Sequence, residues 1–337
     1  MKSWKITRFG SIDGLASIDE GEPTPGPGEV LVRVRAVSLN YRDLTALRME
    51  RPGNLPPPFT PCSDGAGEVI AVGSEVSEWI VGDRVVGTFF REWTDGPFNM
   101  AYHKAANGGS APGVLAESVI LPAAALLPIP EPFTFEEAAC LPCAAVTAWQ
   151  SLFTRGGLTE GRTVLTLGTG GVSIFALQLA VAAGAKVIIT SSSDEKLARA
   201  KSLGAWETVN YRTHPEWDKE VWRITGKHGV DHVVEVGGPG TLGKSLNSVA
   251  AGGQIALIGV LTGFGAPDVS LFPLVARNAR IDGIYVGSRA DFSALNAFLT
   301  QREIKPIIDQ AFPFHEAPAA FSHLESGAHF GKIVITG

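Results

Sequence analysis

The chain has 337 residues, which is enough for about two domains. Apolar residues make up 45% of it and charged residues 18%, an ordinary globular balance that excludes a disordered protein. The net charge is −6 and no clustered basic stripe is present, so the sequence does not indicate a nucleic-acid-binding protein. Three cysteines exclude a disulfide-held scaffold and fit a reducing compartment.

No targeting or membrane segment is evident in the sequence. Residues 1–10 carry charges but no apolar stretch of the kind found in secretory signals. The longest apolar run is 172–185, and its fourteen residues are too few to span a bilayer as a helix. We therefore expect a cytoplasmic protein that has no membrane partner.

Residues 1–130 are predicted to form an antiparallel β domain. The segment 29–39 alternates apolar and polar residues, as a half-buried strand does, and three shorter segments have a similar pattern. These segments are 67–72, 84–88 and 116–121. The stretch 91–113 has few signals for strand or helix, and loops of this length in compact domains are usually functional or mobile.

Residues 131–287 are predicted to form a second domain. Thr134 and Glu137 form a capping box, and a helix is predicted over 143–153. From residue 163 apolar strands alternate with helices, which predicts a parallel sheet covered on both faces. The last segment, 288–337, loses this alternation and is expected to return to the first domain. The predicted fold class is α/β, with an antiparallel β domain and a doubly wound parallel sheet.

A glycine-rich turn follows the first strand of the second domain and leads into a helix. It contains Gly168, Gly170, Gly171 and Val172, and it matches the G-x-G-x-x-G dinucleotide fingerprint with Ser173 at the third glycine position. Gly168 would permit the tight turn, Gly170 would let the backbone approach a pyrophosphate, and the helix N-terminus would face the anion. The strand–turn–helix context favours a cofactor site, and the alternative is a glycine-rich turn that binds no ligand.

The end of the next predicted strand lacks the acidic residue that is typical of NAD-binding proteins. Ser191, Ser192 and Ser193 occupy that position, and Lys196 follows them. A carboxylate there would repel a 2′-phosphate by about 3 kcal/mol at about 5 Å, so its absence favours NADPH. The alternative is that Ser193 only caps the helix that begins at Asp194, and both interpretations can hold because three serines are available.

By these features the chain resembles the medium-chain dehydrogenase/reductase superfamily, in particular its zinc-free quinone oxidoreductase and enoyl reductase-like branch; overall it also resembles the zinc-type alcohol dehydrogenases. The resemblance implies a GroES-like catalytic domain and a Rossmann domain with substrate in the cleft between them. It also implies a homodimer formed through the edge of the Rossmann sheet at 281–286. The stretches that carry it are AVSLNYRDL (36–44), PCSDGAGEVIAVGSEV (61–76), VGDRVVG (81–87), CLPCAAVTAW (140–149), LTLGTGGVSIFALQLA (165–180), KLARAKSLGA (196–205) and HFGKIVI (329–335).

The positions that hold catalytic zinc in zinc-dependent members of this family read Asn40, Ser63 and Cys143. One of the three is a usual zinc ligand, and 89–115 contains no cysteine for a structural zinc lobe, so we expect no metal. Cys140 and Cys143 have the spacing of a thioredoxin-like redox motif, but packing is the interpretation that we favour.

The resemblance places Asn40 and Asp43 beside the nicotinamide as catalytic residues. Asn40 is expected to position the substrate carbonyl or the ribose, and Asp43 to orient Asn40 or Arg42 or to relay a proton. Tyr41 is the nearest side chain that could act as an acid. The alternatives are structural roles. Asn40 could form a hydrogen bond within a turn, Asp43 could cap the helix that begins near Leu44, and Tyr41 could be a packed aromatic residue with no chemical role.

The same resemblance implies further cofactor contacts. Tyr211 would pack near the adenosine, and Thr147 would lie near the nicotinamide. Val286 and Ser288 lie where backbone groups hold the carboxamide, and Lys332 could reach a phosphate. The remaining contacts are expected at two strand ends, at Val236, Gly237, Ile258, Gly259 and Val260.

Without a metal, conjugate reduction is easier than reduction of a simple ketone, because it produces an enolate or phenolate rather than an alkoxide. The leading hypothesis is therefore an NADPH-dependent reductase of an enone or a quinone. An NAD(P)-dependent alcohol or aldehyde dehydrogenase is the first alternative, and a non-catalytic nucleotide-binding sensor or structural protein is the second. The substrate would be a small molecule, in a pocket lined by 91–113 and 261–272.

Overall fold

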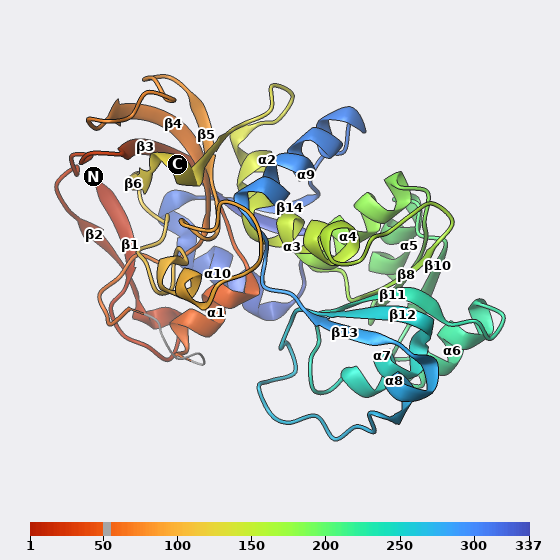
Figure 1. Ribbon diagram of the computed structural model, residues 1–337. Helices are drawn as coiled ribbons and strands as arrows, with labels where there is room; N and C mark the ends of the chain where they lie inside the picture. The colour runs from red at the N-terminus through yellow and green to blue at the C-terminus, as the bar shows by residue number, and fades with distance from the viewer. Residues whose placement is uncertain (50–54) are drawn as a thin grey trace. The chain divides into compact units, whose positions relative to one another are not determined.

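The computed structural model describes residues 1–49 and 55–337, and they divide into two compact units. Unit 1 comprises Met1–Val146 and Gly287–Gly337, and unit 2 comprises Thr147–Val286. Both chain ends lie in unit 1 (Figure 1). Residues 131–146, which the sequence predicts to lie in the second domain, belong to unit 1, because helix α2 (Phe135–Ala139) packs against strands β3 and β4 of that unit.

Unit 1 is built on a seven-stranded sheet in which all pairs are antiparallel except β14 with β15. The strand order is β14–β15–β3–β4–β5–β7, and β6 pairs with β3. The C-terminal segment therefore supplies two strands of the sheet that begins near the N-terminus. The strands are β3 (Glu29–Ser38), β4 (Asp64–Val72), β5 (Arg84–Gly87), β6 (Ser118–Pro122), β7 (Leu126–Pro128), β14 (Ile308–Pro313) and β15 (Lys332–Thr336), and a separate antiparallel pair is formed by β1 (Lys2–Ile6) and β2 (Leu15–Asp19).

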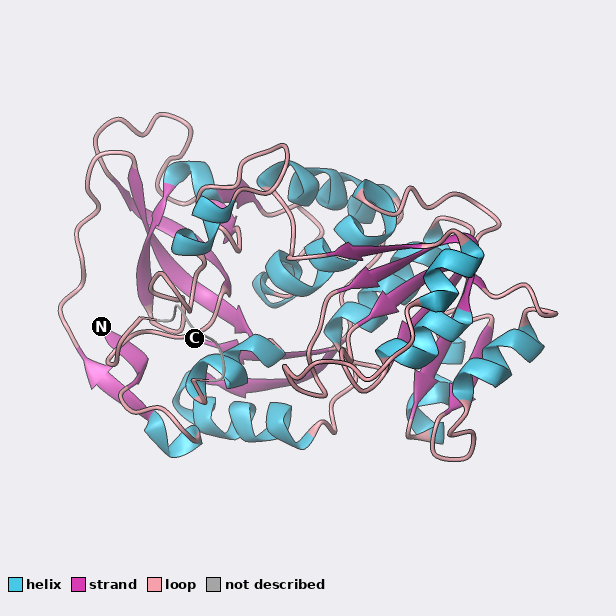
Figure 2. Cartoon of the chain, turned by 60° about the horizontal axis from the view of Figure 1, so that its bottom comes forward, coloured by secondary structure: helices cyan, strands magenta, loops and turns pink. Residues whose placement is uncertain are grey.

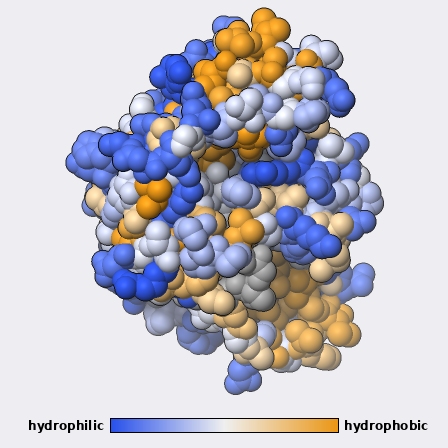
Figure 3. Space-filling model, turned by 90° about the vertical axis from the view of Figure 1, so that its left-hand side faces the viewer, coloured by the Kyte–Doolittle hydropathy of each residue, from blue (hydrophilic) through white to orange (hydrophobic). Residues whose placement is uncertain are grey.

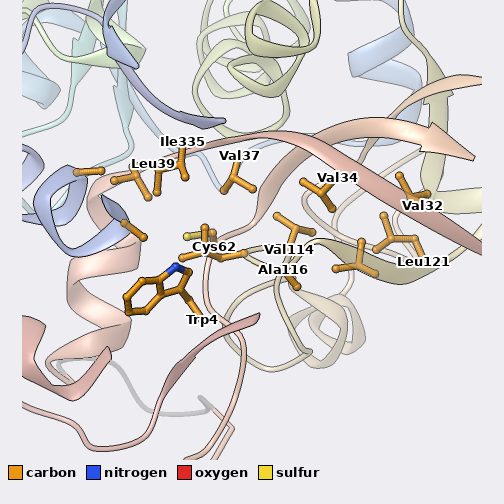
Figure 4. Close-up of a cluster of buried hydrophobic side chains, with 14 of the residues drawn as sticks. Trp4, Val32, Val34, Val37, Leu39, Cys62, Val114, Ala116, Leu121 and Ile335 are labelled. Carbon is orange, nitrogen blue, oxygen red and sulfur yellow. The ribbon is translucent and has the colours of Figure 1, made fainter. Parts of the chain in front are cut away.

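The apolar core of unit 1 lies against this sheet. Val32, Val34 and Leu39 belong to it, and so does Trp4 from β1. The thiol of Cys62 lies among these apolar side chains (Figure 4). Burial raises the pKa of the Cys62 thiol far above its usual range, so this sulfur packs as an apolar group.

Among its described residues, unit 1 contains four α-helices, of which α2 and α10 (Ala317–Ser326) pack against the sheet. The other two are α1 (Tyr41–Leu47) and α9 (Arg289–Gln301), with 3₁₀ turns at Ile12–Gly14, Met100–Ala105, Ala123–Ala125 and Phe314–Glu316. The 3₁₀ turn Met100–Ala105 lies in the stretch that we predicted to be irregular. Aromatic rings of that stretch pack on one another, with Phe98 edge-on to Phe90, Trp93 and Tyr102, so the loop has an apolar core of its own.

Unit 2 is built on a six-stranded parallel sheet of order β10–β9–β8–β11–β12–β13. This order is that of a doubly wound nucleotide-binding fold, in which the direction of the strand order reverses between β8 and β11. The strands are β8 (Thr163–Leu167), β9 (Lys186–Ser191), β10 (Glu207–Asn210), β11 (Val230–Glu235), β12 (Val249–Leu257) and β13 (Arg280–Gly283).

Helices run beside the parallel strands of unit 2 (Figure 2). They are α4 (Gly171–Ala182), α5 (Asp194–Ser202), α6 (Trp217–Ile224), α7 (Leu242–Ser248) and α8 (Phe272–Arg277). The two sheets confirm the predicted fold class, an antiparallel GroES-like sheet together with a Rossmann sheet. The regular helix predicted over 143–153 is wrong in detail: α3 (Val146–Trp149) lies between π-helical turns at Leu141–Ala145 and Gln150–Thr154.

Within the described residues, none of the helices has the length and apolar character needed to cross a bilayer. The face shown in Figure 3 mixes hydrophilic and hydrophobic residues rather than presenting one continuous apolar surface.

Gly67 gives a test of the pairing between β3 and β4. A Cβ atom at Gly67 would lie 2.0 Å from the carbonyl oxygen of Arg33, so the two strands could not keep their spacing. We expect Gly67→Ala to lower the free energy of unfolding by about 1–3 kcal/mol or more, measured by urea unfolding. Gly21→Ala is the control, because a Cβ there meets nothing within 4 Å. Equal stability of the two variants would contradict this packing.

Candidate functional site

The candidate site in unit 1 begins where β3 ends and α1 starts. Asn40 is the N-cap of α1, and its backbone N–H donates to Asp43 Oδ2 at 2.8 Å. The backbone N–H of Asp43 in turn donates to the carbonyl of Asn40 at 2.9 Å. The helix-capping role that was the alternative for Asp43 is therefore observed: its carboxylate caps α1 and fixes the backbone at Asn40.

Lys332 reaches the same place from the last strand of the sheet. β15 pairs with β3, and this pairing brings Lys332 next to residues 39 and 40. The Nζ of Lys332 donates to the carbonyl of Leu39 and to Asn40 Oδ1, each at 2.6 Å. The lysine is 3% exposed, so the prediction that it reaches a cofactor phosphate is not supported: its ammonium is buried and already bonded within unit 1.

Asp64, the first residue of β4, is a second buried carboxylate in this site. It accepts from the hydroxyl of Ser63 at 2.6 Å and from the backbone N–H of Cys143 at 3.0 Å. Burial raises the pKa of Asp64, while the ammonium of Lys332 and the hydrogen bonds from the Ser63 hydroxyl and the Cys143 backbone act in the opposite direction. Asp64 therefore links β4 to the π-helical turn that contains Cys143.

Asp43 is completely buried, and burial raises its pKa to about 6. The guanidinium of Arg42, with Nη1 at 3.7 Å from Asp43 Oδ1, counteracts part of this shift, and Lys332 does so more weakly. The nearby carboxylate of Asp64 adds to the shift. Asp43 therefore changes its protonation state close to the physiological range.

Arg42 is held by a group that sequence reasoning missed. Its Nη1 donates to the carbonyl of Asn107 at 2.7 Å, and its guanidinium lies 4.8 Å from the ring centre of Phe89. Asn107 is fully buried, and its Oδ1 accepts from Arg91 Nε at 2.6 Å. The loop 91–113 is thereby fastened to α1. A lone Asn within an irregular stretch carries no signal that could have predicted this role.

The three positions aligned with zinc ligands offer a poor donor set for that metal. Asn40 Oδ1 is bonded by the Lys332 ammonium, and Ser63 donates its hydroxyl to Asp64. Burial, followed by the carboxylate of Asp64, raises the pKa of the Cys143 thiol, and Cys143 is the one usual zinc ligand among the three positions. Over residues 1–49 and 55–337, no three His, Cys, Asp or Glu side chains are grouped so that they could hold a metal ion. The site therefore does not fit catalytic zinc.

Cys140 and Cys143 are both free thiols. The Cys140 thiol donates to the carbonyl of Glu136 at 3.2 Å and is completely buried, so it packs within its helix. This geometry favours packing over a redox pair. Tyr41, the proposed acid, packs partly buried against the core of unit 1, and its catalytic role stays a prediction.

In unit 2 the glycine-rich turn has the geometry of a phosphate-binding loop. Gly168 follows β8 with φ +72°, a backbone conformation that favours glycine. Gly170 is the N-cap of α4, which begins at Gly171 and continues through Val172. Ser173, at the third glycine position, donates its hydroxyl to the carbonyl of Leu167 at 2.6 Å and so fastens the helix to the end of β8. The first amides of α4 have no partner within the helix, which is the donor set that a pyrophosphate needs.

The three serines at the end of β9 differ in their contacts and burial. Ser193 is the N-cap of α5, and its Oγ accepts from the backbone N–H of Lys196 at 3.3 Å. Ser191 is 4% exposed and accepts from the backbone N–H of Ser193, whereas Ser192 is half-buried. Tyr211, 41% exposed, donates its backbone N–H to the carbonyl of Ser191, so β9 and β10 bring together two predicted adenosine contacts.

The remaining strand ends also meet. Gly259 packs so closely on β11 that a Cβ there would lie 2.0 Å from the carbonyl oxygen of Val236. Ile258 donates its backbone N–H to the carbonyl of Glu235, and Val260 follows in the same turn. The structure thus brings together Val236, Gly237, Ile258, Gly259 and Val260, and their contact with a cofactor stays a prediction.

Glu235 organises these turns and was missed by the sequence reasoning. Its side chain is completely buried, and Oε1 accepts from the backbone N–H groups of Gly237 and Gly238 and from the Thr241 hydroxyl. The other oxygen accepts from the Ser245 hydroxyl. A single acidic residue at a strand end resembles many surface residues, so its role becomes visible only when the turn has folded around it.

Three other predicted cofactor contacts lie near the boundaries between the units in the sequence. Thr147 is 2% exposed within α3. Val286 has φ +60°, which is strained for a β-branched residue and is typical of functional positions. Ser288 is the N-cap of α9, and its Oγ accepts from the backbone N–H of Asp291 at 3.0 Å, so its side chain has a structural role.

Comparisons with known proteins agree with this class of fold. Residues 26–131 match the alcohol dehydrogenase GroES-like domain, and residues 171–301 match the zinc-binding dehydrogenase family. A zinc-type alcohol dehydrogenase-like protein of Schizosaccharomyces pombe is 45% identical over 92% of this chain and 91% of its own length. The 2-methylene-furan-3-one reductase of Solanum lycopersicum is 31% identical over 99% of this chain and 79% of its own length.

Solved structures share the whole architecture. An NAD-dependent alcohol dehydrogenase superposes with a TM-score of 0.91 at 34% identity, over the full length of both chains. A mycobacterial protein solved with NADPH has a TM-score of 0.83 at 28% identity, also over both full chains. The fold and these relatives thus define a type of oxidoreductase. The chain belongs to the medium-chain dehydrogenase/reductase superfamily.

Asp43 gives a test of the buried charges. Because its folded pKa of about 6 lies above the ordinary 3.8, the folded protein binds this proton more tightly than the unfolded chain. The contribution of Asp43 to stability is present below about pH 4 and is lost as the pH rises through about 6. The stability of wild type relative to Asp43→Asn should therefore fall by on the order of 3 kcal/mol from pH 4 to pH 7, measured by urea unfolding. A constant difference would contradict the assignment.

Proposed function

We propose that this protein is an NADPH-dependent oxidoreductase that reduces an activated C=C bond or a quinone without catalytic zinc. The observation that carries the proposal is the bonding of Asn40: its amide is held by the buried Lys332 ammonium at a position where a metal-dependent relative needs a ligand. An amide and a cation can stabilise developing negative charge on oxygen, but they do not replace three zinc ligands.

The chemistry of this donor set favours conjugate reduction. Reduction of a simple ketone leaves an alkoxide, a strong base that metal enzymes stabilise directly. Reduction of an enone or quinone leaves an enolate or phenolate, which is a much weaker base and needs only hydrogen-bond donors. Asn40 is the group that we place on the substrate oxygen, and Asp43 fixes the backbone of Asn40 through its capping bond.

Unit 2 would hold the cofactor, which supplies a hydride when bound. The amides at the start of α4 would bind the pyrophosphate, and the turns after β11 and β12 would contact the nicotinamide half. Ser191 and Ser192, with Lys196, offer hydroxyl and ammonium donors where an NAD-binding protein carries a carboxylate. These donors favour a 2′-phosphate and therefore NADPH, even though Ser193 is used as a helix cap.

A second candidate is an NAD(P)-dependent alcohol or aldehyde dehydrogenase. The descriptions of the Schizosaccharomyces pombe relative and of the solved NAD-dependent enzyme favour it. The tomato reductase, whose substrate by name is an activated exocyclic alkene beside a ketone, favours the proposal made here. A binding protein without turnover is the outcome expected if neither reaction occurs.

We also propose that the protein forms a homodimer through β13 and acts in the cytoplasm. β13 is the last strand of the six-stranded sheet, and Phe272 and Val275 of the adjoining α8 are 70% and 76% exposed. An unpaired strand edge beside exposed apolar side chains is a surface suited to pairing with a second copy. The three free thiols fit a reducing compartment.

The first test is turnover with a panel of substrates. Anaerobic mixing with NADPH is expected to oxidise the cofactor in the presence of enones or quinones, faster than with simple aldehydes, as followed by absorbance. Metal analysis should find well under one zinc per chain, and chelation should leave the rate unchanged. Stoichiometric zinc whose removal abolishes activity would overturn the metal-free proposal, and NADPH binding without any turnover would support the sensor alternative.

Asn40→Ala tests the residue that we place on the substrate. We expect kcat/KM to fall by about 10-fold or more while the Kd of NADPH changes little, because the lost bond acts on the transition state. Asn296→Ala is the matched control, since both asparagines are 8% exposed and Asn296 lies in α9 outside this cluster. Unchanged turnover in Asn40→Ala would remove Asn40 from the mechanism.

Cofactor choice is tested at the serines. NADPH should bind about 10-fold more tightly than NADH, a difference of about 1.4 kcal/mol. Ser191→Asp should abolish or reverse this preference, because its carboxylate repels the 2′-phosphate and accepts from the ribose hydroxyls. Ser202→Asp, exposed on α5, is the control for added charge. Fluorescence titration measures each Kd, and equal wild-type affinities would mean that the serines act only as a cap.

A further inference from the structure

Lys332 is a buried cation with two bonds inside unit 1. Lysine is almost never fully buried unless its charge is paired, so an ammonium that is 3% exposed requires an explanation. Nζ donates to Leu39 O and Asn40 Oδ1. The carboxylates of Asp64 and Asp43 both experience its positive charge, and it lowers their pKa values.

The bond to Lys332 decides which way the Asn40 amide points. An ammonium has donors and no acceptor, so only the oxygen of the amide can face it. The NH₂ group of Asn40 is therefore directed away from Lys332. This Nδ2 is buried and, among the described residues, has no hydrogen-bond partner of good geometry. Without Lys332 the amide could turn over and present its oxygen instead.

The charges in this cluster are balanced only if Lys332 is counted. Asp43 and Asp64 contribute two carboxylates, and Arg42 lies 3.7 Å from Asp43. Lys332 is the second cation, bonded to the amide whose side chain lies beside Asp64. Removal of one member of a buried charge set leaves the others uncompensated, so the ammonium cannot be lost without consequence.

We propose that Lys332 is a positioning residue for Asn40: its buried ammonium fixes the amide so that the NH₂ group, and not the oxygen, is presented to a substrate carbonyl. This inference rests on the proposed function for the role of Asn40 toward substrate. Lys332 itself touches neither substrate nor cofactor and acts through the Asn40 side chain. The carbonyl oxygen of the substrate would then face the NH₂ donor of Asn40 and not its oxygen.

The test is a double-mutant cycle of Lys332→Met and Asn40→Ala. In the presence of Asn40, Lys332→Met should lower kcat by about 10-fold with the Kd of NADPH within about twofold of wild type. In the Asn40→Ala background the same change should alter kcat by less than about twofold. Lys305→Met is the control, because Lys305 is a half-buried lysine that pairs with Glu137 in another part of unit 1. Its kcat should match wild type.

Two results would overturn the proposal. Equal losses of kcat in both backgrounds would mean that Lys332 acts independently of Asn40. A rise of 10-fold or more in the Kd of NADPH with unchanged kcat would mean that Lys332 contacts a cofactor phosphate. If Lys332→Met does not fold, Lys332→Gln takes its place in the cycle, because an amide NH₂ still donates but carries no charge. We then expect a loss of kcat that is smaller than that of Asn40→Ala. This loss should be absent in the Asn40→Ala background.

The same four proteins are compared by urea unfolding, which needs no activity. Non-additive changes in stability are expected because the two side chains are directly bonded. If wild type reduces no enone or quinone while the unfolding cycle is non-additive, the proposed function fails and the Lys332–Asn40 contact stands. Additive changes in stability would overturn the contact whatever the activity.

Discussion

The structure around α1 depends on the burial of charge. Asp43 and Asp64 are carboxylates without access to water, and they are tolerated because Arg42 and Lys332 lie beside them. Removal of one partner from such a set typically costs about 3–5 kcal/mol, more than most single contacts in a domain. The cap of α1, the turn at Cys143 and the strand that carries Lys332 are therefore held in one arrangement.

The sequence predicts the parts of the molecule whose determinants are local. The order of strand, glycine-rich turn and helix at residues 163–182 is predicted correctly, because apolar periodicity and Gly168 act over a few positions. The cap at Ser193 is local as well, and there the structure shows that the helix-cap interpretation is true for one serine. The two remaining serines are not caps, so their predicted contact with the 2′-phosphate is tested by titration with NADPH and NADH.

The sequence does not predict contacts that depend on distant pairing. Lys332 and Asn40 are 292 residues apart, and only the pairing of β15 with β3 brings them together. Sequence reasoning therefore placed the lysine on a phosphate. Glu235 and Asn107 were missed for a related reason: each organises a turn whose conformation has no periodic pattern, and a buried polar hub looks like a surface residue until its donors are known.

The division of the chain has a consequence for synthesis on the ribosome. Unit 2 is continuous in sequence, whereas unit 1 is completed by residues that follow the whole of unit 2. A nascent chain can therefore form the Rossmann sheet early, while Asp43 and Asp64 wait for the ammonium carried by β15. Until β15 is synthesised, these carboxylates lack one of their two cations, and residues 36–38 of β3 lack their pairing with β15. The buried charges around α1 can thus be balanced only after the last strand of the chain has been synthesised.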